Sequence, residues 1–518
     1  MTDQTTLTNP WRSDLPASLV VLLVALPLCL GIALASGAPL SAGLIAGVVG
    51  GLLVGALSGS PLMVSGPAAG LTAIVVSGIA AAGSFRGFLV AVVIAGVLQA
   101  LLGVLRAGII GYYFPSAVIR GMLAAIGIIL ILKQLPHAVG YDASFEGDEA
   151  FRQTNDETTF SALRHVIDAV HPGAIIVALV ALGIILAWDR FKPSSLRIVP
   201  AALLAVLAGT GLNALFPMLS DSYVLNPTHL VQLPVAAQPA DWLAYLTWPD
   251  WSMLWSPVTW RLAVTIAIVA SLETLLSLEA TDKMDPYKRE SDTNRELLAQ
   301  GLGNFTSGLL GGLPVTGVIV RSAANIDAGA VSRRSTILHG VLLLGAVLTL
   351  PVVLNRIPLA ALAAILLYTG FKLASPALFR MTWRQGLSQF IPFAVTLVAI
   401  VLTDLLVGIA IGLAVGLFFI LAEHLRQPAL RRVSPTHAVL TRYVLPDQAT
   451  FLSKANIERT LEALPAGSRV EIDGRGTSRF DPDVLEQLHE FSATAKLRNI
   501  DYRLVGVPAA ATTPTHKH

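Results

Sequence analysis

The chain is organised around the stretch GGLPVTGVIVRSAANIDAGA, residues 311–330. It is apolar enough to enter a bilayer, yet glycines and a proline interrupt its first residues, and it contains one arginine, Arg321. Irregular backbone at membrane depth occurs only where it is buried in protein or lines a water-filled cavity. A charge near the bilayer centre costs roughly 2.5–3.5 kcal/mol on insertion scales and typically marks a substrate or ion path. We therefore interpret this segment as half of an anion-binding site.

The composition of the whole chain is that of a membrane protein. Hydrophobic residues make up 54% of the 518 positions and charged residues 13%, against about 25% charged in soluble domains. The formal net charge of +2 gives no sign of nucleic-acid binding, and the single cysteine, Cys29, excludes a disulfide framework. The sequence contains no nucleotide-binding loop, metal-ligand cluster or nucleophile–base set, so we expect no enzyme, no metal site and no cofactor. The N-terminal residues lack the pattern of a cleaved signal peptide.

Apolar runs of about 20 residues predict the membrane-spanning helices. The first seven are expected at residues 16–36, 39–58, 63–82, 86–106, 115–136, 172–188 and 198–216. The second seven are expected at residues 259–281, 293–311, 314–330, 335–353, 357–374, 387–403 and 405–425. The chain is therefore predicted to be an α-helical polytopic membrane protein with fourteen spans.

The charges of the loops predict the orientation of these spans. The positive-inside rule places Lys and Arg in cytoplasmic loops, and with both termini inside, the basic residues fall in the inside loops. The predicted outside loop 217–258 contains neither Lys nor Arg, and the other long outside loop, 137–171, is acidic. We expect a multi-pass protein of a bacterial-type inner (plasma) membrane with both termini in the cytoplasm.

The two sets of seven spans have the same order of features. Residues 43–70 form a glycine-rich span followed by an interrupted one, and residues 297–317 repeat that order. Gly/Pro-interrupted segments at matching positions of two halves point to a transporter site. Because seven is odd, the second half enters the membrane from the opposite side, which predicts an inverted repeat. Each interrupted span then begins as a short extended piece and continues as a half-helix, whose N-terminus suits an anion.

The composition changes near residue 427, where the predicted transmembrane domain (residues 1–427) ends. Residues 436–508 alternate strands and helices, which predicts a small α/β domain with helices packed on one sheet. Its clearest element is an amphipathic helix at 481–499, whose apolar face is formed by Val484, Leu485, Leu488 and Phe491. The tail, residues 509–518, is predicted to be disordered.

Five sequence blocks in this order resemble the SulP family of anion transporters, which have a membrane domain followed by a STAS domain. The blocks are VALPLCLGIALASG (24–37), SGPAAGLTAIV (65–75), SLETLLSLEATD (271–282), QGLGNFTSGLLGG (300–312) and PVTGVIVRSAANIDAG (314–329). The sequences of these blocks are most similar to those of the branch that contains cyanobacterial bicarbonate transporters. The resemblance implies a seven-plus-seven inverted repeat, an elevator motion of a core domain past a gate domain, a cytoplasmic STAS-like domain at 436–508 and a homodimer.

The resemblance also implies the positions of the site. It places the substrate anion between the third and tenth spans, and it assigns the coupling ion to the eighth span. The implied substrate-binding residues are Ala68, Ala69, Gly70, Thr72, Gly317, Val318, Ile319 and Arg321. The implied coupling-ion residues are Glu273 and, one turn below it on the same face, Ser277.

Several of these positions depart from the bicarbonate branch. That branch has threonines at the positions of Ala68 and Ile319, and it uses the second one to hold sodium. The side chain of Ile319 offers no oxygen, which a hard cation requires, so proton coupling through Glu273 is favoured over sodium coupling. Arg321 matches the arginine of many other family members, where it favours either an anion site or a pair with Glu273.

We therefore expect secondary active transport of a small inorganic anion, bicarbonate or sulfate, coupled to H+ or Na+. The alternatives are a dicarboxylate (fumarate-like) symporter, an uncoupled anion channel or exchanger, and a membrane-embedded sensor; Arg321 disfavours a nucleobase permease. In the C-terminal domain, Thr477 and Ser478 are candidate phosphate acceptors, although a dimer contact or regulatory platform is the favoured role. Asp404 is predicted to cap the last span, and Asn304 fits a helix contact as well as a pore.

Overall fold

The computed structural model describes residues 10–142, 159, 170–191, 200–233, 245–426, 430–433 and 440–509. Most of the predicted acidic loop, residues 436–439 of the predicted C-terminal domain and the tail from residue 510 lie outside this described part. The chain divides into two compact units, Met1–Gly416 and Leu417–His518. Each unit is described by itself below.

The described residues of the first half of the membrane unit form helices and one short strand, joined by loops. Its elements are α1 (Pro10–Ala35), α2 (Leu40–Val49), the π-helical turn η1 (Gly50–Val54), α3 (Gly55–Leu57), β1 (Ser65–Pro67), the 3-10 turn η2 (Ala69–Leu71), α4 (Thr72–Ala82), α5 (Phe85–Val104), η3 (Ala107–Tyr113), α6 (Ser116–Val139), α8 (Pro172–Phe191) and α9 (Ala201–Leu219). Three short 3-10 turns follow, η5 (Asp221–Tyr223), η6 (Pro227–His229) and η7 (Trp251–Trp255).

The second half repeats this composition. Its elements are α11 (Pro257–Met284), α12 (Thr293–Leu310), β2 (Val315–Gly317), α13 (Ile319–Asp327), α14 (Arg334–Thr349), α15 (Pro351–Leu354), α16 (Leu359–Leu373), α17 (Pro376–Arg384), α18 (Leu387–Leu402) and α19 (Leu405–Arg426). A helix lies in each of the fourteen predicted ranges. Within the described residues, nine helical segments are long and apolar enough to cross a membrane, and three more are apolar but shorter. The prediction of a helical polytopic membrane protein is therefore confirmed.

Some boundaries and elements differ from the sequence prediction. The interrupted spans predicted at 63–82 and 314–330 become helical only at Ala69 and Ile319, because the residues before them are extended. Helix α17 was predicted as a cytoplasmic loop, although Ser375 followed by Pro376 is a typical helix start. The loop prediction failed because Arg380 and Arg384 lower the hydropathy of a helix that buries only Thr382.

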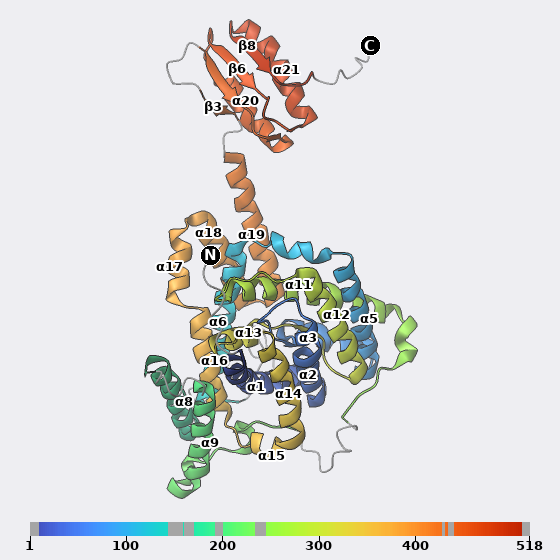
Figure 1. The fold of residues 1–518 in the computed structure, drawn as a ribbon, viewed down its shortest axis with the longest axis vertical. Helices are drawn as coiled ribbons and strands as arrows, with labels where there is room; N and C mark the ends of the chain where they lie inside the picture. The colour runs from blue at the N-terminus through green and yellow to red at the C-terminus, as the bar shows by residue number, and fades with distance from the viewer. Residues whose placement is uncertain are drawn as a thin grey trace. The chain divides into compact units, whose positions relative to one another are not determined.

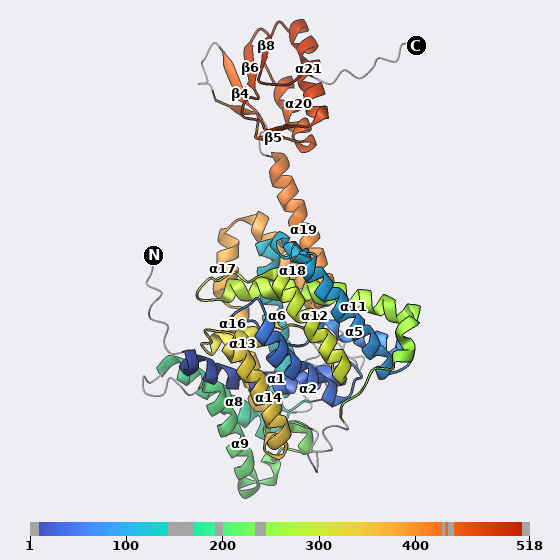
Figure 2. The same ribbon diagram turned by 45° about the vertical axis from the view of Figure 1, so that its right-hand side comes forward.

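The two halves of the chain interleave in space. One group of helices combines α1, α2, α5, α11, α12, α13 and α14, and in both views α12 lies along α5 while α14 and α13 lie against α1 (Figures 1 and 2). The other group combines α6, α8, α9, α16 and α18, in which α6 packs against both α16 and α18. We call these helix group one and helix group two. Glycines allow the turn η1, which continues α2, to pack closely on α14, since a Cβ on Gly51 would lie 2.6 Å from the Cα of Gly340.

The C-terminal unit contains a small α/β structure with its own hydrophobic core. Its strands and helices are β3 (Arg431–Arg432), β4 (Thr441–Val444), β5 (Gln448–Ala449), the turn η8 (Phe451–Ser453), α20 (Lys454–Glu462), β6 (Arg469–Asp473), β7 (Arg479–Phe480), α21 (Pro482–Leu497) and β8 (Asp501–Val505). The main sheet has the order β3-β4-β6-β8, in which β3 is antiparallel and the other three strands are parallel. Helices α20 and α21 lie on the same side of this sheet (Figure 2), as the alternation of strands and helices predicts.

Candidate functional site

Two three-residue strands, one from each half of the chain, meet inside the membrane unit. β1 pairs antiparallel with β2, so that Ser65 lies opposite Gly317 and Pro67 opposite Val315. All six residues are buried. The pairing satisfies backbone groups that would otherwise be left without hydrogen bonds at membrane depth. This arrangement agrees with the predicted extended piece before each half-helix.

The half-helix α13 begins directly after β2, with Val318 as its N-cap residue. The N–H of Gly317 donates to the hydroxyl of Thr274 (3.3 Å), and the N–H of Val318 donates to the carbonyl of Val64 (2.9 Å). These two predicted anion donors are therefore engaged by the protein itself. Within the described residues, no partner is found for the next three N–H groups, residues 319–321, which a helix start leaves unpaired. The N–H groups that this helix start offers therefore belong to residues 319–321, and a role of Gly317 and Val318 in anion binding stays a prediction.

The other half-helix begins at η2 and continues as α4. Ala68 is buried and extended, while Ala69 and Gly70 are half-buried in η2. Thr72 opens α4, and its hydroxyl oxygen is buried with no hydrogen-bond partner among the described residues. The sequence prediction places Ala68, Ala69, Gly70 and Thr72 at this start, and the structure brings them together there.

The predicted coupling residue Glu273 lies at the same helix start. Its side chain comes from the middle of α11 and is 6% exposed. A Cβ built on Gly70 would lie 3.0 Å from Oε1 and 3.2 Å from Oε2 of Glu273, so the carboxylate packs directly on this glycine. Ser277 is buried one turn further along α11. A carboxylate beside a helix N-terminus is stabilised by the unpaired N–H groups and the helix dipole.

The buried arginine lies behind the paired strands. Arg321 is fully buried, and its Nη2 donates to the Sγ of Cys29 on α1 at 3.4 Å. Its Nη1 occupies the space where a side chain of Gly66 would be, because a Cβ there would lie 2.1 Å away. Within the described residues, Nε and Nη1 have no hydrogen-bond partner and no carboxylate lies at salt-bridge distance from Arg321. The pair with Glu273 that the sequence left open is therefore not formed.

Sequence reasoning overlooked a second basic side chain in this region. His339 on α14 is fully buried and packs against Gly51, and neither ring nitrogen has a partner among the described residues. An ionisable residue inside an apolar span is by itself a sign of function. Applying that rule to the run ILHGVLLL, residues 337–344, would have identified His339.

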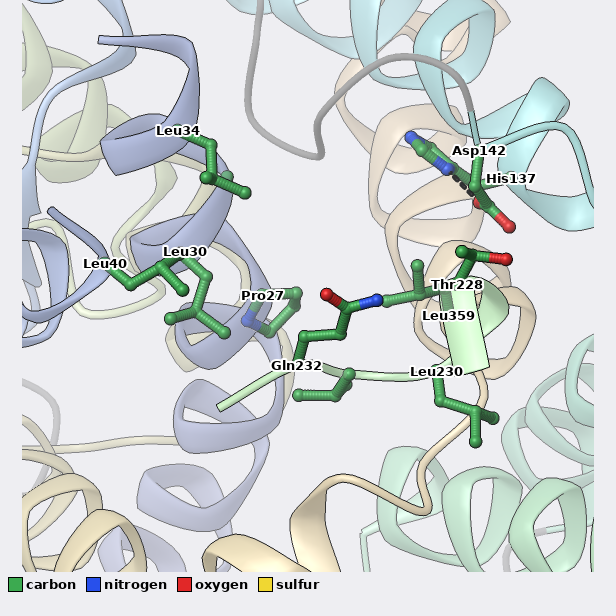
Figure 3. A pocket seen from close by; sticks show the side chains of 12 residues that line it. Pro27, Leu30, Leu34, Leu40, His137, Asp142, Thr228, Leu230, Gln232 and Leu359 are labelled. Carbon is green, nitrogen blue, oxygen red and sulfur yellow. Dashed lines mark hydrogen bonds and ion pairs between the residues drawn. The ribbon is translucent and has the colours of Figure 1, made fainter. Parts of the chain in front are cut away.

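A separate cavity of about 300 Å³ lies between α1 and the segment after α9. Figure 3 shows Pro27, Leu30 and Leu34 of α1 on one side of it and Gln232 and Leu230 on the other. No predicted site residue is among the described residues that line this cavity. It is therefore distinct from the paired half-helix starts.

One end of this cavity is polar. Asp142 accepts hydrogen bonds from His137 and His229, each at 2.5 Å (Figure 3 shows the first). Burial raises the pKa of Asp142, but the hydrogen bonds from the two histidines outweigh it and hold the pKa below its usual value. No group of three or more His, Cys, Asp or Glu side chains that could hold a metal ion exists in the described part of the chain.

The two candidate phosphate acceptors of the C-terminal unit form hydrogen bonds to the backbone. The hydroxyl of Thr477 donates to the carbonyl of Pro446 (2.9 Å), and that of Ser478 donates to the carbonyl of Asp447 (3.1 Å). Both hydroxyls therefore stabilise the turn between β6 and β7. Their phosphorylation stays a prediction.

These features define a class of protein: a multi-pass helical membrane protein in which two interrupted helices from opposite halves meet at paired strands. Residues 11–427 match the Sulfate permease family. The chain belongs to this family, whose members are anion transporters and not enzymes, so the prediction of a non-enzymatic membrane transporter is confirmed.

Two curated relatives illustrate the match. YvdB of Bacillus subtilis, whose name proposes sulfate transport, is 30% identical over 399 residues, which cover 76% of this chain and 70% of that protein. The bicarbonate transporter BicA of Synechocystis is 28% identical over 364 residues, which cover 68% of this chain and 59% of that protein. The match thus spans less than two thirds of BicA.

Solved structures have the same fold. The transmembrane domain of a cyanobacterial bicarbonate transporter, BicA, aligns with a TM-score of 0.56 and 25% identity, covering 77% of this chain and 98% of that one. The murine anion transporter Slc26a9 in the inward-facing state aligns with a TM-score of 0.68 and 16% identity, covering 96% of this chain and 86% of that one. At 16% identity, the likeness to Slc26a9 shows a shared fold alone.

Proposed function

We propose that the protein is a secondary active transporter of a small inorganic anion, bicarbonate or sulfate, driven by a proton gradient. The observation that carries this proposal is the meeting of two half-helix starts beside Glu273. The N–H groups of residues 319–321, the start of α4 and the hydroxyl of Thr72 are the donors available to an anion. The relatives named for sulfate and bicarbonate transport support these two substrates.

Arg321 would act on the anion through its charge. Its guanidinium is buried without a carboxylate partner among the described residues, and a buried charge interacts strongly because the surrounding dielectric constant is low. The positive charge behind β1 and β2 therefore adds to the two helix dipoles. This combination favours an anion over a neutral substrate such as a nucleobase.

Glu273 would couple transport to the proton. Its carboxylate packs on Gly70, at the start where the anion would bind, so an ionised Glu273 repels the anion while a protonated one does not. Anion and proton would therefore bind together and be released together. Ser277 offers a further oxygen nearby, but Ile319 contributes none, which is why we propose H+ and not Na+ as the coupling ion.

The remaining architecture is proposed by the same reasoning. We propose that residues 1–427 cross the membrane fourteen times as a seven-plus-seven inverted repeat with both termini in the cytoplasm of a bacterial-type inner membrane. Helix group one would be the moving core of an elevator and helix group two the gate. The C-terminal region, residues 436–508, would be a cytoplasmic STAS-like domain, and the protein would form a homodimer.

The test is uptake of labelled bicarbonate, sulfate and fumarate into proteoliposomes, with and without a pH gradient and a sodium gradient. We expect uptake of bicarbonate or sulfate driven by the pH gradient, and its loss in Glu273→Gln. Exchange of anion without any gradient should persist in this variant, because a neutral Glu273 side chain still permits binding.

Glu279→Gln is the matched control, because Glu279 lies on the same helix but pairs with Lys283 at 3.2 Å near its end. This control should retain at least about half of the proton-driven uptake. Undiminished proton-driven uptake by Glu273→Gln would refute the coupling role. Uptake of fumarate alone, or a current independent of any coupled gradient, would favour the dicarboxylate carrier or the channel.

A further inference from the structure

The helix α12 presents a row of buried polar side chains to the paired strands. Glu296, Gln300 and Asn304 are spaced four residues apart, which places them on one face of the helix, and all three are fully buried. An adjacent side of α12 packs closely on α5. A Cβ on Gly301 would lie 2.3 Å from the backbone N of Ala100, and one on Gly96 would lie 2.3 Å from the N of Phe305. The glycines thus hold α12 firmly against its neighbour.

Asn304 pairs with both backbone groups of Val315 in β2. Its Oδ1 accepts from the N–H of Val315 at 2.6 Å, and its Nδ2 donates to the carbonyl of Val315 at 2.9 Å. This is the pattern that a neighbouring strand would offer, since one residue of a strand exchanges both its hydrogen bonds with its partner. The side-chain amide of Asn304 therefore replaces a third strand at the edge of β2.

The same helix face holds the other half-helix start. Nε2 of Gln300 donates to the hydroxyl of Ser65 in β1 at 2.6 Å and to Oε1 of Glu296 at 2.9 Å. Oε2 of Glu296 accepts from the N–H of Gly59 at 2.9 Å and from the hydroxyl of Ser58, in the turn before β1. One helix thus contacts the strand before α4 and the strand before α13.

We infer that the buried polar face of α12 positions the two half-helix starts relative to each other, with Asn304 acting on the start of α13 and Gln300 on the start of α4. Both are positioning residues, because they act on the anion donors through β2 and β1. Each strand contributes only three residues to the pairing. Hydrogen bonds from the side chains of α12 therefore provide a large part of the contacts that hold β1 and β2 in place. The inference deepens the proposed function, and its consequence for anion affinity rests on that function.

The test compares three variants of the full-length protein by hydrogen–deuterium exchange. Asn304→Leu removes both bonds to Val315, and we expect at least tenfold faster exchange of the amides in residues 313–321. Gln300→Leu should instead accelerate exchange in residues 64–72. Gln99→Leu is the matched control, because buried Gln99 accepts a hydrogen bond from Asn304 at 2.7 Å but leaves both bonds to Val315 in place. It should change neither region by more than twofold.

Uptake measurements add a second readout. The KM for the transported anion should rise about tenfold in Asn304→Leu and stay within twofold of the wild type in Gln99→Leu. If exchange in residues 313–321 were unchanged in Asn304→Leu, or rose equally in all three variants, the positioning role would be refuted. The exchange experiment needs no substrate, so absence of uptake by the wild-type protein would count against the proposed function only. Should Asn304→Leu fail to fold, Gln300→Leu tests the same role at the other start.

Discussion

At the scale of single residues, the clearest contact in the candidate site is that between Gly66 and Arg321. Nη1 of the buried arginine occupies the side-chain position of residue 66, so the glycine makes room for the charge. The sequence identified Arg321 as a charge at membrane depth, which follows from hydropathy alone. That the guanidinium contacts Cys29 on α1 and Gly66 in β1, and forms no ion pair with Glu273, follows only from packing.

Gly66→Ala should therefore displace the guanidinium while leaving its charge in the protein. A Cβ 2.1 Å from Nη1 and 3.0 Å from Cζ cannot be accommodated without movement of Arg321. We expect the apparent affinity for the anion to fall about tenfold, which corresponds to roughly 1.4 kcal/mol. Anion-dependent thermal stabilisation of the purified protein would measure this.

Gly345→Ala is the control for the preceding prediction, because a Cβ on Gly345 of α14 meets nothing within 4 Å. It should leave the affinity unchanged. Equal affinity of Gly66→Ala and the wild type would show that the position of the arginine does not matter to the anion.

At the scale of the elements, a polar contact connects the end of α13 to helix group two. Nζ of Lys372 on α16 lies 3.7 Å from Oδ1 of Asp327, the last residue of α13, and 4.6 Å from the ring of Tyr368. The hydroxyl of Tyr368 donates to Asp189 on α8. The contact therefore joins the half-helix of the candidate site to two helices of the other group.

Lys372→Met should raise the transport rate by up to about fivefold while leaving the apparent affinity unchanged. The pair is about one-third exposed, and such pairs contribute roughly 0–1 kcal/mol. If the two helix groups move past each other, this contact must break in each cycle. Asp327→Asn should have the same effect, and the double variant should add nothing further.

Lys283→Met is the matched control for this pair, because the partner of Lys283 is Glu279 on the same helix. Its transport rate should equal that of the wild type. Additive effects of the two single substitutions would show that Lys372 and Asp327 do not act together.

At the scale of the whole molecule, the C-terminal unit contains its own cluster of charged side chains around Asp473. Asp473 at the end of β6 accepts hydrogen bonds from the backbone N–H, the Nε and the Nη2 of Arg475, each at 3.0 Å, and from Arg442 on β4. The bonds from Arg475 first, and then that from Arg442, hold the pKa of Asp473 well below its usual value. A carboxylate with a lowered pKa stabilises the folded state above the unfolded pKa of about 3.9.

Asp473→Asn should therefore lower the stability of the C-terminal unit at pH 7 by about 1 kcal/mol, given the exposure of the arginines. Calorimetry of the full-length chain should show that the midpoint temperature of unfolding of this unit falls by several degrees. The difference from the wild type should shrink as the pH falls below about 4, because Asp473 of the unfolded chain then takes up a proton while the folded carboxylate, with its lowered pKa, stays ionised.

Asp501→Asn serves as the control, since Asp501 forms only exposed pairs with Arg469 (3.9 Å) and Arg503 (3.4 Å). It should change the free energy of unfolding of the C-terminal unit by less than about 0.5 kcal/mol. A difference between Asp473→Asn and the wild type that stayed constant down to pH 3 would contradict the ionic role of Asp473.

Local sequence patterns were enough to predict the helices, the two interrupted spans and the α/β character of the C-terminal region. Hydropathy, loop charge and the positions of glycine and proline are local properties, and they carry this information without any contact between distant residues. For the same reason Asp404 was correctly predicted to cap α19, where it accepts from the N–H groups of Leu406 and Val407 at 2.9 Å.

How residues 311–330 form a candidate site depends on contacts between segments that are distant in the sequence. The amides of Gly317 and Val318 are bonded to Thr274 and Val64, which are 43 and 254 residues away in the chain, so no local pattern could reveal it. Asn304 fitted a helix contact or a pore equally well until its amide was found on Val315. The physical reason is that hydrogen bonds between distant segments depend on the direction of each side chain, and packing sets that direction.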